Sequence, residues 1–118
     1  MKTINFRLSL IQKAYNLYLH LYPILKNLPK RNRYTLGEKI ECTLLDIVES
    51  VSLASIQIKT LREPIVHKAS CKIEVLKLLV RLSYDLNLIN DHQYISLEDQ
   101  VNEIGRMVGG WIKSLRTQ

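Results

Sequence analysis

Apolar residues recur at alternating intervals of three and four along almost the whole chain, and this spacing limits the possible folds more than any other feature. The clearest series consists of Tyr94, Leu97, Val101, Ile104, Val108, Trp111 and Leu115. Residues at these intervals share one face of an α-helix. Only 4 glycines and 3 prolines stand among 118 residues, too few for the frequent turns of a β-sandwich or barrel. We expect an all-α protein with a single domain over residues 1–118.

Two helices are expected in the first half. The first spans about residues 6–28, with Pro23 inside it and a kink there. The link LPKRNRYT (residues 28–35) is expected to be a loop. Thr35 to Glu38 fit a capping box, which places the start of the second helix at Thr35. The expected inner faces are Ile11, Ala14, Tyr15, Tyr18, Leu21, Tyr22, Leu25 and Leu28 in the first helix, and Leu36, Ile40, Leu44, Ile47, Val51, Ala54 and Ile58 in the second.

Two further helices are expected in the second half. The second helix should end near residues 59–61, and Pro64 suits the first turn of a third. Asn90 or Asp91 can cap a fourth helix. The third helix should bury Ala69, Ile73, Leu76, Val80, Ser83 and Leu86. Short links force antiparallel neighbours, so the sequence predicts an up-down-up-down four-helix bundle.

More apolar residues are present than these inner faces use. The surplus residues are Leu17, Leu19, Leu45, Val48, Leu53, Val75, Leu78, Leu79 and Leu82. A lone bundle of this size would expose many of them, and contiguous exposed apolar surface usually marks an interface. We therefore expect a homo-oligomer; the alternative is a wide core with scattered exposed leucines.

No secretory signal stands out, and no run approaches the ~18 apolar residues of a membrane helix. Cys42 and Cys71 lack paired metal spacing and are expected as reduced thiols in the core of a cytoplasmic protein. The histidines are isolated, whereas zinc needs clustered ligands. No Gly-rich phosphate loop, catalytic triad or carboxylate pair is visible, so we expect no metal, no cofactor and no catalytic residue.

Charge is distributed unevenly along the chain. Seventeen Lys and Arg against eleven Asp and Glu give a net charge of +6. The first 37 residues contain seven basic residues and no acidic one, whereas residues 82–105 contain five acidic residues and no Lys or Arg. A basic protein with segregated charge suggests a polyanionic partner, usually nucleic acid. The alternatives are a solvated basic surface and charge complementarity between helices of one bundle.

The densest basic group precedes the expected second helix and consists of Lys26, Lys30, Arg31 and Arg33. The start of that helix also favours anions through its free amides and dipole. Tyr34 adjoins the group and could stack on a base. These residues predict a phosphate-binding patch, and a solvated loop is the alternative.

The expected third helix carries Lys68 with Lys72, and Lys77 with Arg81. Each pair is four residues apart and so shares a helix face. These pairs could follow a nucleic-acid backbone. Alternatively, they belong to a solvated face and are partly offset by neighbouring acidic residues.

Two other patterns suggest weaker hypotheses. Arg62 and His67 have the Arg-x4-His spacing of HEPN ribonucleases, in which imidazole would act on a ribose hydroxyl. Gly105, Gly109 and Gly110 fall within six residues of the expected fourth helix, beside Trp111. Because each glycine costs a helix roughly 1 kcal/mol relative to alanine, we expect close packing there, within the bundle or between subunits. A ligand slot is the alternative.

Several blocks of the chain resemble the Avd-like four-helix-bundle family. They are LPK (residues 28–30), RYTLGEKI (33–40), Leu53-Ala54, LLVRL (78–82) and EIGRMVGGWIKSL (103–115). One arm of the family comprises the accessory variability determinants of diversity-generating retroelements. The other comprises proteins encoded in intervening sequences of large-subunit ribosomal RNA genes. The block GRMVGGWIKS is more similar to the first arm.

The resemblance implies barrel-like homopentamers that bind RNA and DNA through basic surfaces. It also implies association with the retroelement reverse transcriptase during adenine-directed mutagenic copying of template RNA, without a catalytic centre. Among the basic residues of the matching blocks are Lys30, Arg33, Arg81, Arg106 and Lys113, and the last two join the candidate nucleic-acid contacts. We therefore predict a non-enzymatic accessory protein, and an RNA-binding protein of the second arm is the alternative.

Overall fold

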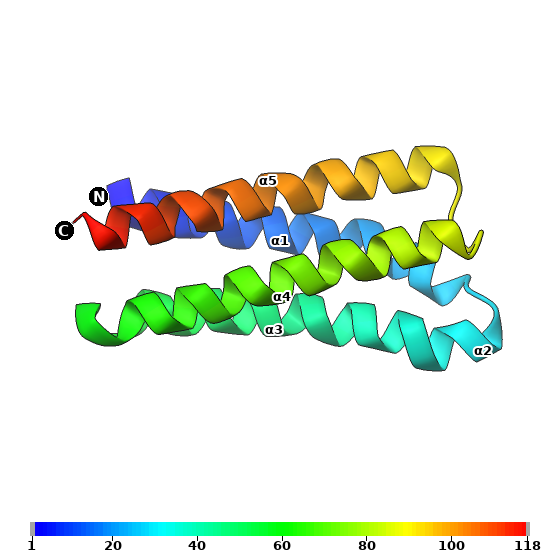
Figure 1. Ribbon diagram of the computed structural model, residues 1–118, viewed down its shortest axis with the longest axis horizontal. Coiled ribbons are helices and arrows are strands. Elements are labelled where there is room, and N and C mark those ends of the chain that lie inside the picture. Colours follow the sequence, from blue (N-terminus) through cyan, green and yellow to red (C-terminus); the bar gives the residue numbers. More distant parts are fainter. Residues whose placement is uncertain (1, 118) are drawn as a thin grey trace.

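Four long helices account for most of residues 2–117, the part of the chain that the computed structural model describes; side chains are described from Phe6 onward. They are α1 (Lys2–Lys26), α3 (Glu38–Ile56), α4 (Lys59–Asp85) and α5 (Asp91–Arg116). Two short helical segments, α2 (Lys30–Asn32) and the π-helix η1 (Arg33–Gly37), join α1 to α3. The long helices run antiparallel in a rod (Figure 1) with extents of 46 × 23 × 20 Å. The predicted all-α, four-helix architecture is confirmed.

The core lies between all four long helices. Each of α1 and α4 packs against both α3 and α5, so the sequence order up-down-up-down is also the order around the bundle. The most deeply buried large side chains include Leu10, Leu17, Leu44, Ile47, Ile73, Leu76, Leu97, Val101 and Val108. Burying a side chain of this size contributes about 1.5–3 kcal/mol, which makes this core the main source of stability.

The inner faces expected for the second half of the chain are largely confirmed. On α5 every position of the series from Leu97 to Leu115 is buried, and Tyr94 is half-buried. On α4 the series is buried as far as Ser83, but Leu86 is exposed. Leu86 lies just beyond the last residue of α4, four residues after the exposed Leu82, and so continues the outer face of the helix and not the buried one.

In α1 the expected inner face is partly wrong. Tyr15 and Tyr22 are more than half exposed, whereas Leu17, expected as surplus surface, is fully buried. The buried series is Leu10, Ala14, Leu17, Leu21, Leu25 and Leu28. Tyrosine has an apolar ring and a polar tip, so its presence in a 3–4 pattern does not decide which side of a helix meets the core. On α3 the expected face is buried from Ile40 to Ala54, and Ile58 lies beyond the helix and is exposed.

The expected loop over residues 28–35 is wrong, because helical geometry resumes at Lys30 directly after Pro29. Thr35 is inside this helical segment and does not cap a helix; its hydroxyl donates to the carbonyl of Arg31 at 2.8 Å. Threonine can make this bond to the preceding turn or an N-cap bond, so the sequence motif fits both. α1 continues through Pro23 and ends at Lys26.

Gly37 allows the α1–α2 link to lie close to η1. A Cβ atom at Gly37 would approach Leu28 Cδ1 to 3.1 Å and the carbonyl oxygen of Asn32 to 3.3 Å. Such distances are tighter than ordinary van der Waals contact, and the second atom belongs to the backbone. A glycine at this position therefore lets the π-helix pack against the end of α1.

The expected start of the third helix at Pro64 is also wrong, since α4 begins five residues earlier at Lys59. The end of α3 contributes to this difference. Arg62 donates from Nε to the carbonyl of Ala54 at 3.2 Å and from Nη2 to that of Gln57 at 2.8 Å. These bonds give a side-chain donor to one carbonyl in the last turn of α3 and to that of its C-cap residue Gln57, and they attach the first turn of α4 to the end of α3.

The turn between α4 and α5 follows local rules closely. Asn87 has φ of 60°, and the amides of Asn87 and Leu88 donate to Tyr84 and Ser83, each at 2.9 Å. This is the Schellman arrangement, in which asparagine can replace glycine in the left-handed position. Asn90 then caps α5 in a capping box with Gln93, which confirms the predicted cap.

The predicted burial of the cysteines is wrong. Cys42 and Cys71 are both free thiols on exposed positions of α3 and α4. They occupy outer helix faces because the inner faces of both helices are already filled by the buried apolar series. None of the helices in residues 2–117 combines the length and the apolar character needed to cross a membrane.

Candidate nucleic-acid interface

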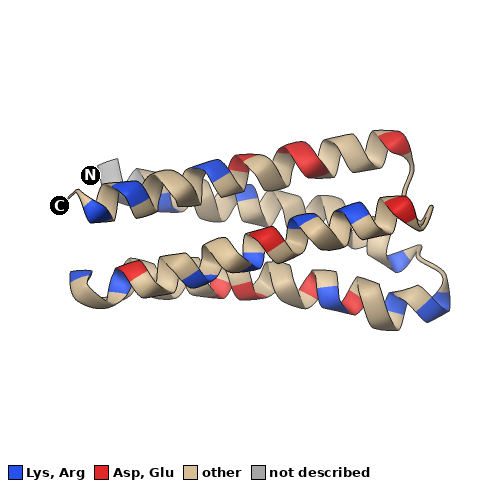
Figure 2. Cartoon of the chain, in the orientation of Figure 1, with Lys and Arg blue, Asp and Glu red and all other residues tan. Residues whose placement is uncertain are grey.

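Four of the predicted basic contacts gather at the end of the bundle opposite the two termini (Figure 2). Lys26 closes α1, Lys30 and Arg31 form most of α2, and Arg33 begins η1. All four are exposed. We call them the basic end. The expected free helix start beside them is absent, because the backbone is helical from Lys30 through Gly37 and into α3.

A pocket of about 300 Å³ lies at the basic end, between α1, η1 and the start of α3. Its lining residues are Tyr22, Leu25, Lys26, Arg33, Tyr34, Gly37, Glu38 and Glu41. We call it the tyrosine pocket. The structure thus brings two of the predicted basic residues, Lys26 and Arg33, to one cavity together with the predicted stacking residue Tyr34.

Hydrogen bonds hold two sides of the tyrosine pocket. The guanidinium of Arg33 donates from Nη2 to the carbonyl of Leu28 at 3.2 Å. The hydroxyl of Tyr18 donates to Glu41 Oε2 at 2.7 Å. This hydrogen bond, followed by partial burial and the negative charge of Glu41, raises the pKa of Tyr18. Tyr18 therefore stays protonated and ties α1 to α3 beside the pocket.

Sequence reasoning missed Tyr22 and Glu41 as parts of this site. The 3–4 pattern places Tyr22 on the inner face of the first helix, yet it is 52% exposed and its ring centre lies 6.2 Å from that of Tyr18. Its polar tip and its seven-residue distance from Tyr15, another exposed tyrosine, are signals for an outer face. No local signal identifies Glu41, since only tertiary packing brings it to α1.

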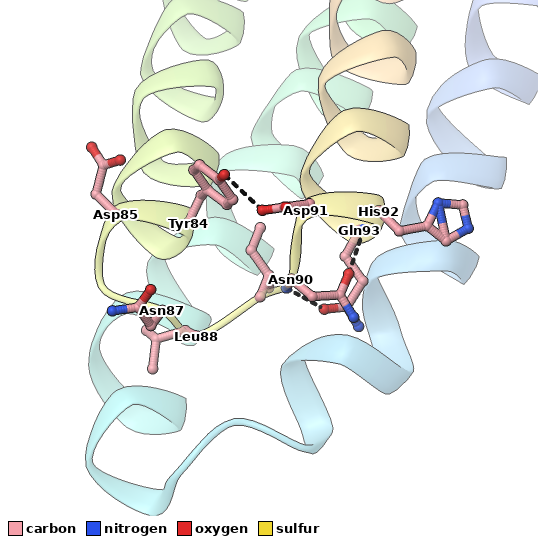
Figure 3. Close-up of a pocket in the computed structure, with 9 residues that line it drawn as sticks. Tyr84, Asp85, Asn87, Leu88, Asn90, Asp91, His92 and Gln93 are labelled. Carbon is pink, nitrogen blue, oxygen red and sulfur yellow. Dashed lines mark hydrogen bonds between the residues drawn. The ribbon is translucent and has the colours of Figure 1, made fainter.

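A second, more open pocket of about 850 Å³ surrounds the α4–α5 turn (Figure 3). It is lined by polar side chains that include Asp85, Asn87, Asn90 and Asp91. The hydroxyl of Tyr84 donates to Asp91 at 2.7 Å, as the dashed line shows. This hydrogen bond and the charge of Asp91 raise the pKa of Tyr84. The acidic lining makes this pocket unsuited to phosphate.

The basic residues of α4 are mostly paired with acidic neighbours. The Nζ atoms of Lys72 and Lys77 lie 3.2 and 3.3 Å from carboxylate oxygens of Asp46 and Glu74. Lys68 is exposed and forms no ion pair within residues 6–117. Exposed pairs contribute at most about 1 kcal/mol, so phosphate could compete for these lysines.

Arg81 belongs to an aromatic cluster. Its Nε lies 3.0 Å from an Asp85 oxygen, and its guanidinium carbon is about 6 Å from the ring centres of both Tyr84 and Tyr94. Those two rings stack with centres 4.4 Å apart. Arg81 therefore already has one anionic and two aromatic partners, which makes it a weaker candidate than the residues of the basic end.

Arg106 and Lys113 are exposed on α5 and do not join the basic end. Arg106 lies near the ion pair between Lys13 and Glu103, whose Nζ–Oε1 distance is 2.8 Å. The hydrogen bond from Lys13, together with the positive charges of Lys13 and Arg106, lowers the pKa of Glu103. Lys113 lies in the last turn of α5, near the C-terminal end of the chain. The structure thus separates these two residues from the basic end.

The two residues of the ribonuclease-like motif, Arg62 and His67, do not form a common site. Arg62 binds carbonyls of α3, whereas His67 Nε2 lies 3.1 Å from Arg116 Nη2 and 3.6 Å from a Glu63 oxygen. Arg62 and His67 therefore have separate structural partners, and their geometry lends no support to a ribonuclease site.

The glycines do not pack closely inside the bundle. A Cβ atom at Gly105 would make only ordinary contacts, 3.5 Å from Ile73 and Lys77, and one at Gly109 or Gly110 would meet nothing within 4 Å. The expectation of close packing within the subunit is therefore wrong at Gly109 and Gly110. Packing between subunits stays a prediction.

Comparison with known families agrees with the fold and with the sequence blocks. The model of the family described as bAvd-like matches residues 8–115, a segment that includes all four long helices in whole or in large part. No curated protein matches the chain. Because the family match covers far more than half of the sequence, the predicted resemblance is confirmed, and the chain belongs to the bAvd-like family of bacterial accessory variability determinants.

Proposed function

We propose that this protein is a nucleic-acid-binding accessory subunit of a diversity-generating retroelement, without catalytic activity of its own. Membership of the bAvd-like family implies the accessory role and favours the retroelement arm over the ribosomal intervening-sequence arm. The basic end carries the nucleic-acid part of the proposal. Lys26, Lys30, Arg31 and Arg33 are exposed there within eight residues of sequence that contain no acidic residue.

The chemistry expected of the basic end is phosphate neutralisation. Lys and Arg contacts to phosphates release counterions, so affinity falls as salt rises. Such contacts position nucleic acid but carry no sequence information. Binding should therefore be salt-dependent and shared by RNA and DNA, as an accessory protein of template copying requires.

An exposed apolar stripe supports the second part of the proposal, that the protein acts as a homo-oligomer, a pentamer by family resemblance. The outer face of α4 exposes Val75, Leu78, Leu82 and, just beyond its end, Leu86. These residues recur at intervals of three and four and so form one continuous stripe along the helix. Stripes of this kind on a soluble protein usually mark a protein interface.

The third part of the proposal is partnership with the retroelement reverse transcriptase in mutagenic copying of template RNA. It is tested by co-expression with the reverse transcriptase of a diversity-generating retroelement, followed by affinity purification of either protein. Recovery of both after nuclease treatment supports a direct protein contact. Loss of the partner after nuclease treatment would show that nucleic acid alone connects the two.

The test of the basic end compares two variants that lose equal charge. Lys30→Ala with Arg31→Ala alters the basic end, whereas Lys59→Ala with Lys68→Ala alters the opposite half of the rod. We leave Arg33 in place because it also binds the carbonyl of Leu28. The first variant should weaken binding to unrelated RNA and DNA alike and reduce the slope of log affinity against log salt by about 0.7–0.9 per lost contact.

Fluorescence anisotropy of labelled oligonucleotides at several salt concentrations measures both quantities. The control variant should change the slope little. A third variant, Glu98→Gln with Asp99→Asn, makes the protein more basic by two charges elsewhere and reveals any effect of net charge alone. An unchanged salt slope in the folded Lys30/Arg31 variant would contradict the proposed site. A reduced slope in the Lys59/Lys68 variant would place the phosphate contacts on α4 instead.

A further inference from the structure

We infer that the tyrosine pocket binds a base of single-stranded nucleic acid, with the ring of Tyr34 as its stacking platform. This inference rests on the proposed function and adds two statements to it: the ligand is single-stranded, and its base as well as its phosphate is recognised. A base inside a duplex is already stacked and paired, so it is unavailable to such a pocket.

The aromatic surfaces of the pocket come from two elements. Tyr34 on η1 is 62% exposed and Tyr22 on α1 is 52% exposed, although both line the same cavity. Bases stack on exposed aromatic rings whatever their sequence, because every base has a π-face. Leu25 and Gly37, which are both buried, complete the lining with apolar surface.

The size and composition of the pocket favour a base over a phosphate. About 300 Å³ is at the lower limit of ordinary ligand pockets, which run from roughly 300 to 1,000 Å³, so the pocket suits one base and not a larger molecule. The carboxylates of Glu38 and Glu41 line it and would repel a phosphate. They are acceptors, and the exocyclic amino groups of adenine, cytosine and guanine are donors.

Phosphates have a place at the rim of the same pocket. Lys26 and Arg33 line it, and Lys30 and Arg31 are exposed on the adjoining turn of α2. A strand that follows these basic residues would place its sugar–phosphate backbone outside and turn one base inward. The arrangement matches the general design of single-strand sites, a basic track beside aromatic side chains.

The platform is held in place before any ligand binds. Arg33, the residue before Tyr34, donates to the carbonyl of Leu28 at 3.2 Å, and Thr35, the residue after it, donates to that of Arg31 at 2.8 Å. Gly37 is packed against Leu28. A preformed site loses less conformational entropy on binding, so stacking on Tyr34 should appear in the measured affinity.

The test measures the affinity of oligo-dA and of an abasic deoxyribose-phosphate chain of equal length. Both present the same phosphates, and only the first has bases. The wild-type protein should bind oligo-dA more tightly by about 5- to 150-fold, the range that stacking of one base contributes. Tyr34→Leu should reduce this ratio towards one, and Tyr34→Phe should preserve it.

Controls separate stacking from structural effects. Tyr15→Leu removes a tyrosine of similar exposure that does not line the pocket, so the ratio should stay at the wild-type value. Affinity for duplex DNA should be equal in all four proteins. Circular dichroism and light scattering should show unchanged helicity and assembly for Tyr34→Leu.

The outcomes distinguish this inference from the function on which it rests. Equal wild-type affinity for both chains, or a ratio that Tyr34→Leu leaves unchanged, would overturn the base contact while leaving phosphate binding intact. A change in oligomer size with an unchanged ratio would also overturn it, because Tyr34 would then be a subunit contact. Failure of the wild-type protein to bind either chain would overturn the proposed function itself.

Discussion

At the scale of single residues, the arginines show how differently one side-chain type is used in this protein. Arg62 satisfies carbonyls at the end of α3, Arg81 lies beside two stacked tyrosines and Asp85, and Arg31 has no ion pair within residues 6–117. Net charge alone cannot distinguish them. The basic residues that remain available to a polyanion are those whose donors are not already used, and Lys30 and Arg31 of the basic end are among them.

One prediction at this scale concerns the ion pair between Lys13 and Glu103, which connects α1 to α5. The hydrogen bond from Lys13 is the main reason that the pKa of Glu103 lies below its usual value of 4.5. A carboxyl whose folded pKa is lowered stabilises the fold above its unfolded pKa and loses that contribution as pH falls through the folded value. Wild type should therefore melt slightly above Glu103→Gln at pH 7.

The difference should disappear as pH falls below about 4.5, and thermal melts monitored by circular dichroism across this range measure it. Both partners are 42% exposed, so the effect should be small and should shrink in high salt. Asp99→Asn removes an exposed carboxylate of the same helix that forms no ion pair within residues 6–117 and serves as control. A difference that persists at pH 3 would assign the effect to packing and not to charge.

At the scale of helices, α5 combines the strongest amphipathic pattern with its most unusual local feature, two adjacent glycines. Its buried series runs without interruption to Leu115, yet Gly109 and Gly110 lie on the exposed side of the helix, where an added Cβ atom would meet nothing within 4 Å. Glycine in an exposed helix interior lowers stability relative to alanine. Within the subunit, nothing in residues 6–117 offsets this cost.

Gly109→Ala should therefore stabilise the isolated subunit by about 1 kcal/mol. Chemical denaturation at low protein concentration measures the change, and Ser114→Ala on the same helix gives the gain expected at an exposed position without a glycine. A loss of stability or a smaller assembly would contradict free exposure and place Gly109 in a contact between chains. That result would support close packing between subunits.

At the scale of the whole molecule, the rod presents two distinct surfaces. The end opposite the termini, where α2 lies (Figure 1), carries the basic end, and the residues that line the tyrosine pocket come from the adjoining parts of α1, η1 and α3. The outer face of α4 carries the apolar stripe with Leu78, which is 68% exposed. A bundle that self-associates through its side could leave its end free for nucleic acid, so the two proposed activities do not compete for one surface.

Leu78→Lys should weaken assembly without unfolding the subunit, because the side chain makes little contact with the core and a charge in an apolar interface is costly. Light scattering should give the wild type a mass well above the 13.8 kDa of one chain, and the variant a lower mass at equal concentration. Ile95→Lys, at an exposed residue of α5, is the matched control. A monomeric wild type at micromolar concentration would contradict the homo-oligomer and this account of the exposed leucines.

The sequence by itself determined the elements whose signals are local. The 3–4 spacing predicted four helices and the buried face of α5, and the short links predicted their antiparallel order. The polar pair Asn90 and Asp91 predicted the start of α5, where Asn90 is the cap. Each of these signals depends only on residues within a few turns. Where a local pattern was compatible with two structures, tertiary packing decided between them. Packing turned Leu17 inward and Tyr22 outward on α1, and extended the second helical segment back to Lys30.

The candidate site shows the same division. Clustered charge and Tyr34 were visible as a continuous stretch of sequence, whereas the pocket was not, because its walls come from α1, η1 and α3. Glu41 reaches Tyr18 across 23 residues of sequence, and Asp46 reaches Lys72 across 26. Such contacts depend on the relative rotation of packed helices, which the burial of the whole core sets and no short stretch of sequence encodes.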